Sequence, residues 1–416
     1  MPALPRAKAA APRVRELRLL PRTPGETGSR RLRSPGTWHR EHQARGTSTK
    51  HQAPNTQHPK RKSMIWVAVD AMGGDFAPAN VVDGALAAAR HLDLGVALVG
   101  PATLIRTQVE RHAAPVDKNR VRIVDAPDVI AMAESPSAAL RRKPNASIRI
   151  AADLVASGEA AALCSAGHTG ATVMAAHAAF GMLPGVDRPA LAAAVPTRRG
   201  RPAILLDVGA SVECRPPHLL QFAAMGRVYA RVAFDLASPR IALLSIGEEA
   251  SKGNELTKEA HRLLKASSLP FIGNVEAREV YSGDADVIVC DGFTGNVALK
   301  ISEGVVEMVE SLLGEELSST ITMRVGSLLA RRALRHFRRR VDYSEYGGAP
   351  LLGVAGVTII GHGRSSAKAV RNAVAMAYRF ASQRFIERVE QEIAELATAA
   401  GRPMAAGNQP PGAGRN

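Results

Sequence analysis

Short apolar runs alternate with longer amphipathic segments along most of the chain. The runs span four to seven residues and are rich in Val, Ile, Leu and Ala, which is typical of strands buried on both faces. They predict strands over 65–70, 95–99, 121–124, 160–164, 203–206, 241–246, 286–290 and 356–360. Segments with apolar residues every three to four positions predict helices over 79–91, 146–157, 170–180, 217–235, 254–267, 296–313 and 367–397. Buried strands separated by helices predict an α/β fold, a mostly parallel sheet with helices on both faces.

This pattern is missing at both ends of the chain. Residues 1–63 are rich in Arg, Pro, Gly, Thr and His and have no apolar periodicity. Such a segment cannot bury enough apolar surface to offset the entropy lost on ordering. We therefore expect a disordered basic extension at 1–63, one ordered domain at 64–400 and a disordered tail at 401–416. Because Met64 directly precedes the first predicted strand, an alternative is that the extension is not translated.

The net charge of +16 is concentrated in the extension. Residues 1–63 hold 15 Lys and Arg against 3 Asp and Glu, which accounts for +12 of the total. A strongly basic chain raises the alternative of nucleic-acid binding, which would depend steeply on salt. Because only +4 is left for the rest of the chain, we expect no nucleic-acid partner for the folded domain. No apolar stretch reaches the roughly 18 residues of a transmembrane helix.

Glycine-containing polar loops follow six of the predicted strands. Ligands of parallel α/β sheets bind beyond the carboxyl ends of the strands, so we expect these loops to line one edge of the sheet and to carry the chemistry. They supply backbone amides, hydroxyls and side-chain amides, which suits the binding of an anion. The loops are 70–75, 165–170, 207–211, 245–249, 291–296 and 361–366. The last lacks the third glycine of a dinucleotide loop, so it is weak evidence for a dehydrogenase.

The loop from Ser165 to Gly170 is the strongest candidate for a phosphate site. It follows a predicted strand and opens a predicted helix, so its amides and the positive end of the helix dipole would face an anion. The alternative is that Ser165 and Thr169 only cap the helix. The candidate phosphate-binding residues are Ser165, Gly167, His168, Thr169 and Gly170.

Residues 324–340 form a second basic region. Seven arginines are interleaved with apolar residues at three- to four-residue spacing, which predicts an amphipathic helix with a basic face. Such a face suits an anionic membrane surface or an acidic protein partner, and the alternative is a solvated charged helix. The candidate contact residues are Arg331, Arg332, Arg335, Arg338 and Arg339.

Seven segments of the chain, in this order, resemble the bacterial phosphate acyltransferase family, which transfers an acyl group from acyl carrier protein to phosphate. The resemblance covers roughly residues 65–380. The matching segments are AVDAMGGDFAP (68–78), SAGHTGA (165–171), DVGASVECRPPHLLQFAAMG (207–226), SIGEEASKGNELTKEA (245–260), FIGNVEAR (271–278), DGFTGNVALKISEG (291–304) and YSEYGGAPLLGVAGVTIIGHGRS (343–365). His168 departs from the family, which usually has Asn there, and Ser211 and Glu213 replace Asn and Asp.

The resemblance implies a Rossmann-like three-layer α/β/α fold and a homodimer with no metal or organic cofactor. It also implies a cytoplasmic enzyme that is peripherally associated with the inner face of the cell membrane. The implied partners are acyl carrier protein, inorganic phosphate and a downstream membrane acyltransferase. That acyltransferase would use the acyl phosphate to acylate glycerol 3-phosphate, which leads to phosphatidic acid. A phosphotransacetylase-like enzyme that uses a short acyl-CoA is the alternative.

Attack of phosphate on a thioester needs a held phosphate and donors for the oxyanion, but no enzyme nucleophile. We therefore expect Lys252, Asn254 and Asn296 to be catalytic donors, with Lys300 as a weaker candidate. The substrate loops would contribute Asp70, Gly73, Gly74, Asp207, Asp291, Gly292 and His362. Cys164 adjoins the phosphate loop, but we expect no acyl-cysteine there. No Cys or His spacing indicates a metal site.

Overall fold

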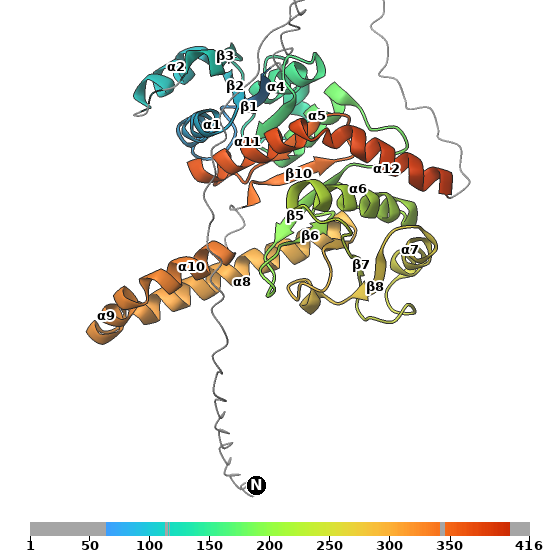
Figure 1. Cartoon of the computed structure of the whole chain (residues 1–416). Coiled ribbons are helices and arrows are strands. Elements are labelled where there is room, and N and C mark those ends of the chain that lie inside the picture. The colour runs from blue at the N-terminus through green and yellow to red at the C-terminus, as the bar shows by residue number, and fades with distance from the viewer. Residues whose placement is uncertain (1–63, 113–114, 116, 342–345, 400–416) are drawn as a thin grey trace, which may run out of the picture. The chain divides into compact units, whose positions relative to one another are not determined.

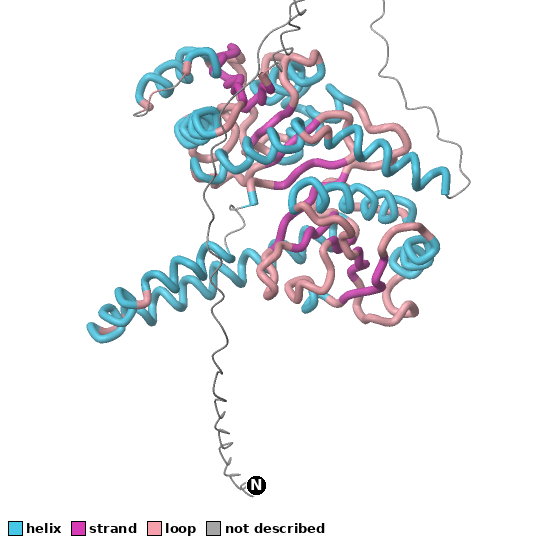
Figure 2. The backbone as a smooth tube through the Cα atoms, viewed as in Figure 1, coloured by secondary structure: helices cyan, strands magenta, loops and turns pink. Residues whose placement is uncertain are grey.

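An eleven-stranded mixed sheet forms the centre of the folded domain (Figures 1 and 2). The computed structural model describes residues 64–112, 115, 117–341 and 346–399, so the predictions for 1–63 and 401–416 lie outside it. The strands lie in the order β3-β2-β1-β4-β11-β10-β5-β6-β9-β7-β8. Their bounds are β1 Ile65–Asp70, β2 Leu94–Gly100, β3 Val121–Asp125, β4 Ala162–Ser165, β5 Ala190–Val195, β6 Ala203–Leu206, β7 Ile241–Leu244, β8 Phe271–Val275, β9 Val287–Val289, β10 Ala349–Leu352 and β11 Val357–Ile360.

Two parallel wings make up the sheet, and antiparallel strands join them. The first wing is β3, β2, β1, β4 and β11, and the second is β6, β9, β7 and β8. Between them, β10 is antiparallel to β11 and to β5, and β5 is antiparallel to β6. Because of these three antiparallel pairings, the strands of the second wing run in the opposite direction to those of the first. The prediction that the six glycine loops share one edge was therefore wrong, because three loops follow strands of each wing.

Helices cover both faces of the sheet, which confirms the three-layer α/β/α fold (Figure 1). Val67 and Val69 of β1 pack in one core with α1, α6 and α11, whereas the intervening Ala68 packs with α4 and α5 on the opposite face. This alternation is the normal geometry of a strand. The α-helices are α1 Ala79–His91, α2 Ala102–Arg111, α3 Pro136–Arg142, α4 Ser147–Ala156, α5 Thr169–Phe180, α6 Pro216–Phe234, α7 Glu255–Ala266, α8 Gly292–Ser318, α9 Ile321–Leu329, α10 Arg331–Val341, α11 Ala367–Ser382 and α12 Phe385–Ala399.

Several elements differ from the prediction, and three missed strands have a local reason. Strand β5 reads Ala-Leu-Ala-Ala-Ala-Val, and alanine is depleted in strands, so its pattern was missed. Strand β8 contains Gly and Asn, and β10 contains Pro, which obscured both. Helices α2 and α3 were also missed. The predicted helix 367–397 is divided into α11 and α12, where Arg384 has a positive φ of 54°.

Helices α8, α9 and α10 form an arm that extends from the second wing and folds back beside itself (Figure 1). The basic helix predicted over 324–340 is in fact two helices that meet at Ala330. Arg331, Arg332 and Arg335 are exposed on α10, while the side chains of Arg338 and Arg339 lie outside the described part of the chain. No helix in the described ranges is both long and apolar enough to span a membrane.

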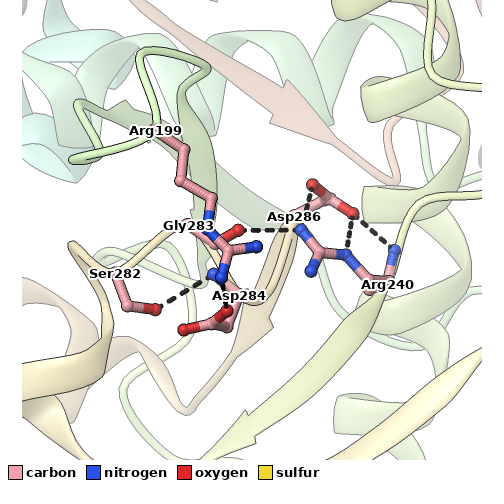
Figure 3. A network of polar contacts seen from close by, with 6 residues as sticks. All are labelled: Arg199, Arg240, Ser282, Gly283, Asp284 and Asp286. Atoms are coloured by element: carbon pink, nitrogen blue, oxygen red, sulfur yellow. Dashed lines mark hydrogen bonds and ion pairs between the residues drawn. The ribbon is translucent and has the colours of Figure 1, made fainter. Parts of the chain in front are cut away.

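Ion pairs tie the second wing together at the amino ends of its strands (Figure 3). Arg240 precedes β7 and donates from Nε and Nη2 to both carboxylate oxygens of Asp286, which precedes β9. Its Nη2 also donates to the Gly283 carbonyl over 2.8 Å. Arg199, in the β5–β6 loop, pairs with Asp284. Because a two-pronged arginine–carboxylate contact fixes orientation, these pairs hold the strands at the end opposite their glycine loops.

Candidate active site

A cavity of about 720 Å³ lies over the centre of the sheet, between α5 and α8. Its floor includes Leu191 and Ala193 of β5 and Ala349 of β10, and its walls include Val173 of α5 and Leu299 of α8. Loops that follow β4, β6 and β11 line the remainder, so both wings contribute to it. The volume falls within the roughly 300–1,000 Å³ of typical ligand pockets. The cavity therefore joins an apolar wall to polar loops at the centre of the fold.

Six of the predicted site residues line this cavity, namely Gly167, Thr169, Gly170, Asn296, Lys300 and His362. Lys300 Nζ lies 2.8 Å from Oε2 of Glu303, so its charge is shared with a neighbour on α8. Arg364 also lines the cavity, although the sequence prediction did not include it. Its position two residues after His362, in one of the six glycine loops, was the available signal.

His168 caps helix α5 at the cavity. Its Nδ1 accepts a hydrogen bond from the Gly170 amide over 3.1 Å. The Gly167 amide donates to Ser165 Oγ over 3.1 Å, so both glycine amides already have partners within the loop. An asparagine at position 168 would cap the helix through its side-chain oxygen. The departure from the family pattern therefore retains the cap, and the positive end of the helix still faces the cavity.

A buried hydrogen bond between Ser165 and Asp70 holds this loop in place. Ser165 Oγ donates to Asp70 Oδ2 over 2.8 Å, and the Met72 amide donates to Asp70 Oδ1 over 3.2 Å. The Asp70 side chain is 3% exposed and Ser165 is 1% exposed, and neither lines the cavity. Burial raises the pKa of the Asp70 carboxyl, while hydrogen bonds from Ser147, Ser165 and Met72 act in the opposite direction. These two predicted site residues therefore position the loop between β4 and α5.

Two predicted glycines allow the loops of the first wing to pack closely. A Cβ on Gly73 would lie 2.6 Å from the amide nitrogen of Gly167. Gly74 has a φ of 103°, and a Cβ there would lie 2.8 Å from the carbonyl oxygen of Gly363. Both substitutions would force the loops apart, since real Cβ atoms do not approach so closely. Gly73 and Gly74 therefore allow the loops that line the cavity to pack closely, although neither glycine lines it.

Asp207 organises the corresponding loop of the second wing. The side chain is fully buried, and it accepts hydrogen bonds from four backbone amides, those of Leu191, Gly209, Ala210 and Ser211. Burial raises the pKa of the Asp207 carboxyl, and the four amides counteract that rise. The contacts join the start of β5 to the loop after β6, which lies at the cavity.

Helix α8 begins against this second loop. Asp291 caps it by accepting a hydrogen bond from the Thr294 amide over 2.9 Å. A Cβ on Gly292 would lie 2.5 Å from the Ser211 carbonyl oxygen, so only glycine permits this packing. As a result, the Asn296 side chain lies one turn into α8 and beside Gly209, where a Cβ would be 2.9 Å from Asn296 Nδ2.

Lys252 and Asn254, both predicted catalytic donors, do not line this cavity. Asn254 caps α7, where its Oδ1 accepts from the Thr257 amide over 2.9 Å. Lys252 is exposed on the loop that precedes the cap. That loop is anchored by Asn274, whose Nδ2 donates to the Glu249 carbonyl over 3.0 Å. The structure thus gives Asn254 a capping role, and the catalytic role of both residues stays a prediction.

The three cysteines are buried or half-buried and hold their protons tightly. Burial raises the pKa of Cys164 to about 12 and that of Cys214 to about 11. Burial also raises the pKa of Cys290. Because the thiolate is the nucleophilic form of cysteine, none of the three is poised for attack on a thioester near neutral pH.

The groups that line the cavity favour binding of an anionic, partly apolar ligand. The Asn296 amide and the Arg364 guanidinium can donate hydrogen bonds, Lys300 is paired with the Glu303 carboxylate, and aliphatic side chains form the other walls. Across the described ranges, no group of three or more His, Cys, Asp or Glu side chains is placed to hold a metal ion.

Two of the solved structures that share the fold of this chain are phosphotransacetylases. A phosphotransacetylase from Streptococcus pyogenes aligns with a TM-score of 0.54 at 16% identity, covering 77% of this chain and 95% of that one. The EutD phosphotransacetylase from Staphylococcus aureus aligns with a TM-score of 0.50 at 17% identity, covering 76% of this chain and 94% of that one. At such low identity the likeness concerns the fold alone.

Sequence comparison is far more specific. A phosphate acyltransferase from Nitratidesulfovibrio vulgaris is 50% identical over 330 residues, which covers 79% of this chain and 94% of that protein. The phosphate acyltransferase from Geobacter sulfurreducens is 48% identical over 330 residues, 78% of this chain and 94% of that protein. A family model described as "Fatty acid synthesis protein" matches residues 65–388. The chain therefore belongs to the phosphate acyltransferase family and is an acyltransferase.

Proposed function

We propose that this enzyme transfers a long-chain fatty acyl group from acyl carrier protein to inorganic phosphate and so supplies an acyl phosphate for phosphatidic acid synthesis. The observation that carries the proposal is the cavity between α5 and α8. Its polar and apolar parts match the two parts of the product, a phosphate and an alkyl chain. Family membership supports acyl transfer to phosphate, and the sequence match covers 94% of each of the two relatives named above.

The amino end of α5 is the proposed phosphate site. Gly167, Thr169 and Gly170 line the cavity there, and the partial positive charge of the helix end favours an anion. Arg364 and His362 approach from the loop after β11. In this proposal Ser165 and Asp70 hold the loop in shape without touching the phosphate.

The apolar wall of the cavity suits a fatty acyl chain. It is formed by aliphatic side chains of α5, β5 and α8 and of the loop that precedes α3. They are Met132, Val173, Met174, Leu191 and Leu299. Burial of each methylene in such a site contributes about 0.8 kcal/mol, so a long chain gains much more binding energy than an acetyl group.

The proposed reaction needs no covalent enzyme intermediate. An oxygen of the bound phosphate attacks the thioester carbonyl carbon, and the carbonyl oxygen becomes an oxyanion. Asn296 is the proposed donor to that oxyanion, because its amide reaches the cavity from the wing opposite the phosphate loop. Collapse of the adduct then breaks the carbon–sulfur bond and releases the carrier as a thiolate. A preorganised oxyanion donor of this kind is worth about 2.7–4 kcal/mol in transition-state stabilisation.

The basic arm is the proposed contact for anionic partners. Arg331, Arg332 and Arg335 are exposed on α10, and an acidic carrier protein would be attracted to them. On α9, Ile321 and Leu329 are 81% and 82% exposed, which also suits contact with the inner face of the membrane. Sedimentation with anionic vesicles across a salt series tests the membrane contact. Binding should weaken as salt rises, and salt-independent binding would contradict an electrostatic contact.

The proposal further includes a cytoplasmic homodimer that acts without metal or organic cofactor. Its product would pass to a membrane acyltransferase that acylates glycerol 3-phosphate. These features follow from the family resemblance, and light scattering of the purified protein tests the dimer.

Donor preference is the sharpest test of the proposed substrate. Thiol release should be measured with palmitoyl-ACP and with acetyl-CoA, each with and without phosphate. We expect phosphate-dependent release from palmitoyl-ACP and a far slower reaction with acetyl-CoA. Faster release from acetyl-CoA would instead favour a phosphotransacetylase-like enzyme.

A further inference from the structure

Residues 197–201, the basic turn, lie between β5 and β6 and carry three arginines. Arg198, Arg199 and Arg201 are all exposed. The backbone between them is tightly closed, since the Gly200 amide donates to the Thr197 carbonyl over 3.1 Å and Thr197 Oγ1 donates to the Arg201 carbonyl over 2.5 Å. The basic turn therefore presents its arginines from a fixed backbone.

A polar cavity of about 480 Å³ lies beside the basic turn, and three arginines line it. Arg199 pairs with Asp284, and Arg240, which precedes β7, pairs with Asp286 (Figure 3). The third, Arg201, has no acidic partner among the residues that the structure describes. Its positive charge is therefore available to a partner molecule.

The end of the arm adds to this positive surface. Arg340 lies at the end of α10, where its Nη2 donates to the carbonyls of Thr197 and Arg198 over 3.5 and 3.4 Å. The side chain of Arg198 likewise has no acidic partner in the described part of the chain. The basic turn and the end of α10 therefore form one continuous basic surface.

Contacts connect the basic turn to the wall of the cavity between α5 and α8. The Arg198 amide donates to the Tyr281 carbonyl over 2.9 Å, and the Tyr281 hydroxyl donates to Ser302 of α8. Ser302 adjoins Glu303, which lines that cavity. Ala194 of β5 also lines it, and the basic turn begins three residues later, at most about 11 Å away along the chain. The basic surface therefore lies beside one end of the proposed acyl site.

A surface of this kind suits a substrate that is carried by an acidic protein. An acyl group tethered to a carrier reaches the cavity only when the carrier rests beside it. Positive charge outside the cavity would attract such a carrier and raise the rate of encounter. A small acyl donor would need no such surface, because it would enter the cavity whole.

We propose that the basic turn and Arg340 form the docking site for the acyl carrier protein and present its thioester to the cavity beside Glu303. The inference rests on the proposed function, because it places the donor of that reaction. It also divides the basic residues of the arm. Arg331 lies nine residues before Arg340, about 13 Å away along α10, so it contacts the carrier less closely than Arg340.

Charge reversal on the basic turn tests this docking site. In Arg198→Glu/Arg201→Glu, the KM for palmitoyl-ACP at low salt should rise at least about tenfold, the lower end of the effect of electrostatic steering on association. The kcat should stay near that of the wild type, because neither arginine lines the cavity between α5 and α8. Arg106→Glu/Arg111→Glu is the matched control, since both arginines are exposed on α2, beside the edge strand β3 of the first wing. Its KM should equal that of the wild type.

Salt provides a measurement that does not depend on the folding of any variant. About 0.1 M salt screens exposed charges that are more than about 10 Å apart. The KM of the wild type for palmitoyl-ACP should therefore rise with salt, and a KM that ignores salt would contradict docking on a basic surface. The single variant Arg201→Ala removes one exposed charge, and its KM at low salt should lie between those of the wild type and the double variant.

The outcomes separate the docking site from the proposed function. If the wild type turns over palmitoyl-ACP and the basic-turn variants keep its KM, the carrier docks elsewhere, although the proposed function stands. If these variants keep the KM but lose binding to anionic vesicles, the basic turn contacts lipid and the docking proposal is wrong. If the wild type turns over no acyl-ACP at all, the proposed function fails and the docking site fails with it.

Discussion

Ser165 Oγ lies 2.8 Å from Asp70 Oδ2, and this buried hydrogen bond joins the ends of two neighbouring parallel strands, β4 and β1. Loops that line the cavity begin at these ends. The pair therefore connects the fold of the first wing to the shape of the proposed phosphate site. Because both side chains are almost fully buried, the effects of changing either can be assigned to support of the loop.

Ser165→Ala should destabilise the protein and weaken phosphate binding. The substitution removes one donor from a buried carboxylate, and an unsatisfied buried group costs about 1–3 kcal/mol. Urea unfolding measures the stability, and the KM for phosphate reports the loop. Ser157→Ala is the control, because Ser157 is an exposed serine at the end of α4. An unchanged KM in a destabilised Ser165→Ala protein would mean that the pair supports the fold and not the site.

Asp70 should make the stability of the protein depend on pH in a defined direction. Burial raises the pKa of its carboxyl above the ordinary value of 3.8, so the folded state binds this proton more tightly than the unfolded state. The stabilising contribution is present below that value and is lost as pH rises through the folded pKa. Relative to Asp70→Asn, the wild type should therefore lose free energy of unfolding as pH increases from acid to neutral. A difference between the two proteins that stays constant, or runs the other way, would contradict the shift.

His168→Asn should behave much like the wild type, whereas His168→Ala should not. Asparagine can accept the Gly170 amide that His168 Nδ1 accepts, but alanine leaves that amide without its cap. Loss of a helix cap costs about 1 kcal/mol. Chemical denaturation and the KM for phosphate should both separate the two variants. If His168→Asn is as impaired as His168→Ala, the imidazole has a role beyond capping.

Gly209→Ala should impair catalysis through Asn296. A Cβ at Gly209 would lie 2.9 Å from Asn296 Nδ2 and would displace the proposed oxyanion donor. We expect kcat to fall in Gly209→Ala and by about 100- to 1,000-fold in Asn296→Ala. In the double variant the effects should not add, because both act on one donor. Gly200→Ala is the control, since Gly200 also has a positive φ but has open space around it.

No acyl adduct should form on Cys164. The pKa of its buried thiol is about 12, so the thiolate is scarce near neutral pH. Mass spectrometry of the intact protein, mixed with palmitoyl-ACP in the absence of phosphate, should show the unmodified mass. An added palmitoyl group that maps to Cys164 would require a covalent mechanism in place of direct attack by phosphate.

The sequence predicted the strands of the two parallel wings except β8, but not how the wings lie relative to one another. The predicted strands are continuous Val-, Ile- and Leu-rich runs, such as 203–206, whose pattern is local. The reversal between the wings depends on β5 and β10, where alanine and proline hide the strand pattern. Without those strands, the glycine loops could not be assigned to two edges.

Glycine loops identified much of the site, but side-chain roles needed coordinates. Gly167 and Gly170 were predicted and do line the cavity, because helix starts can be read from local sequence. The sequence could not show that Ser165 points into the core toward Asp70, or that Asn254 serves as a helix cap. It also missed Arg364, since one arginine in a loop resembles any solvated arginine.

Trapping of the product is the direct test of acyl transfer to phosphate. Wild-type protein should be incubated with palmitoyl-ACP, with and without phosphate, and then treated with hydroxylamine, which converts an acyl phosphate to a hydroxamate. We expect thiol release only in the presence of phosphate, with palmitoyl hydroxamate formed in equal amount. Thiol release without phosphate, or release that yields free palmitate and no hydroxamate, would contradict acyl transfer to phosphate.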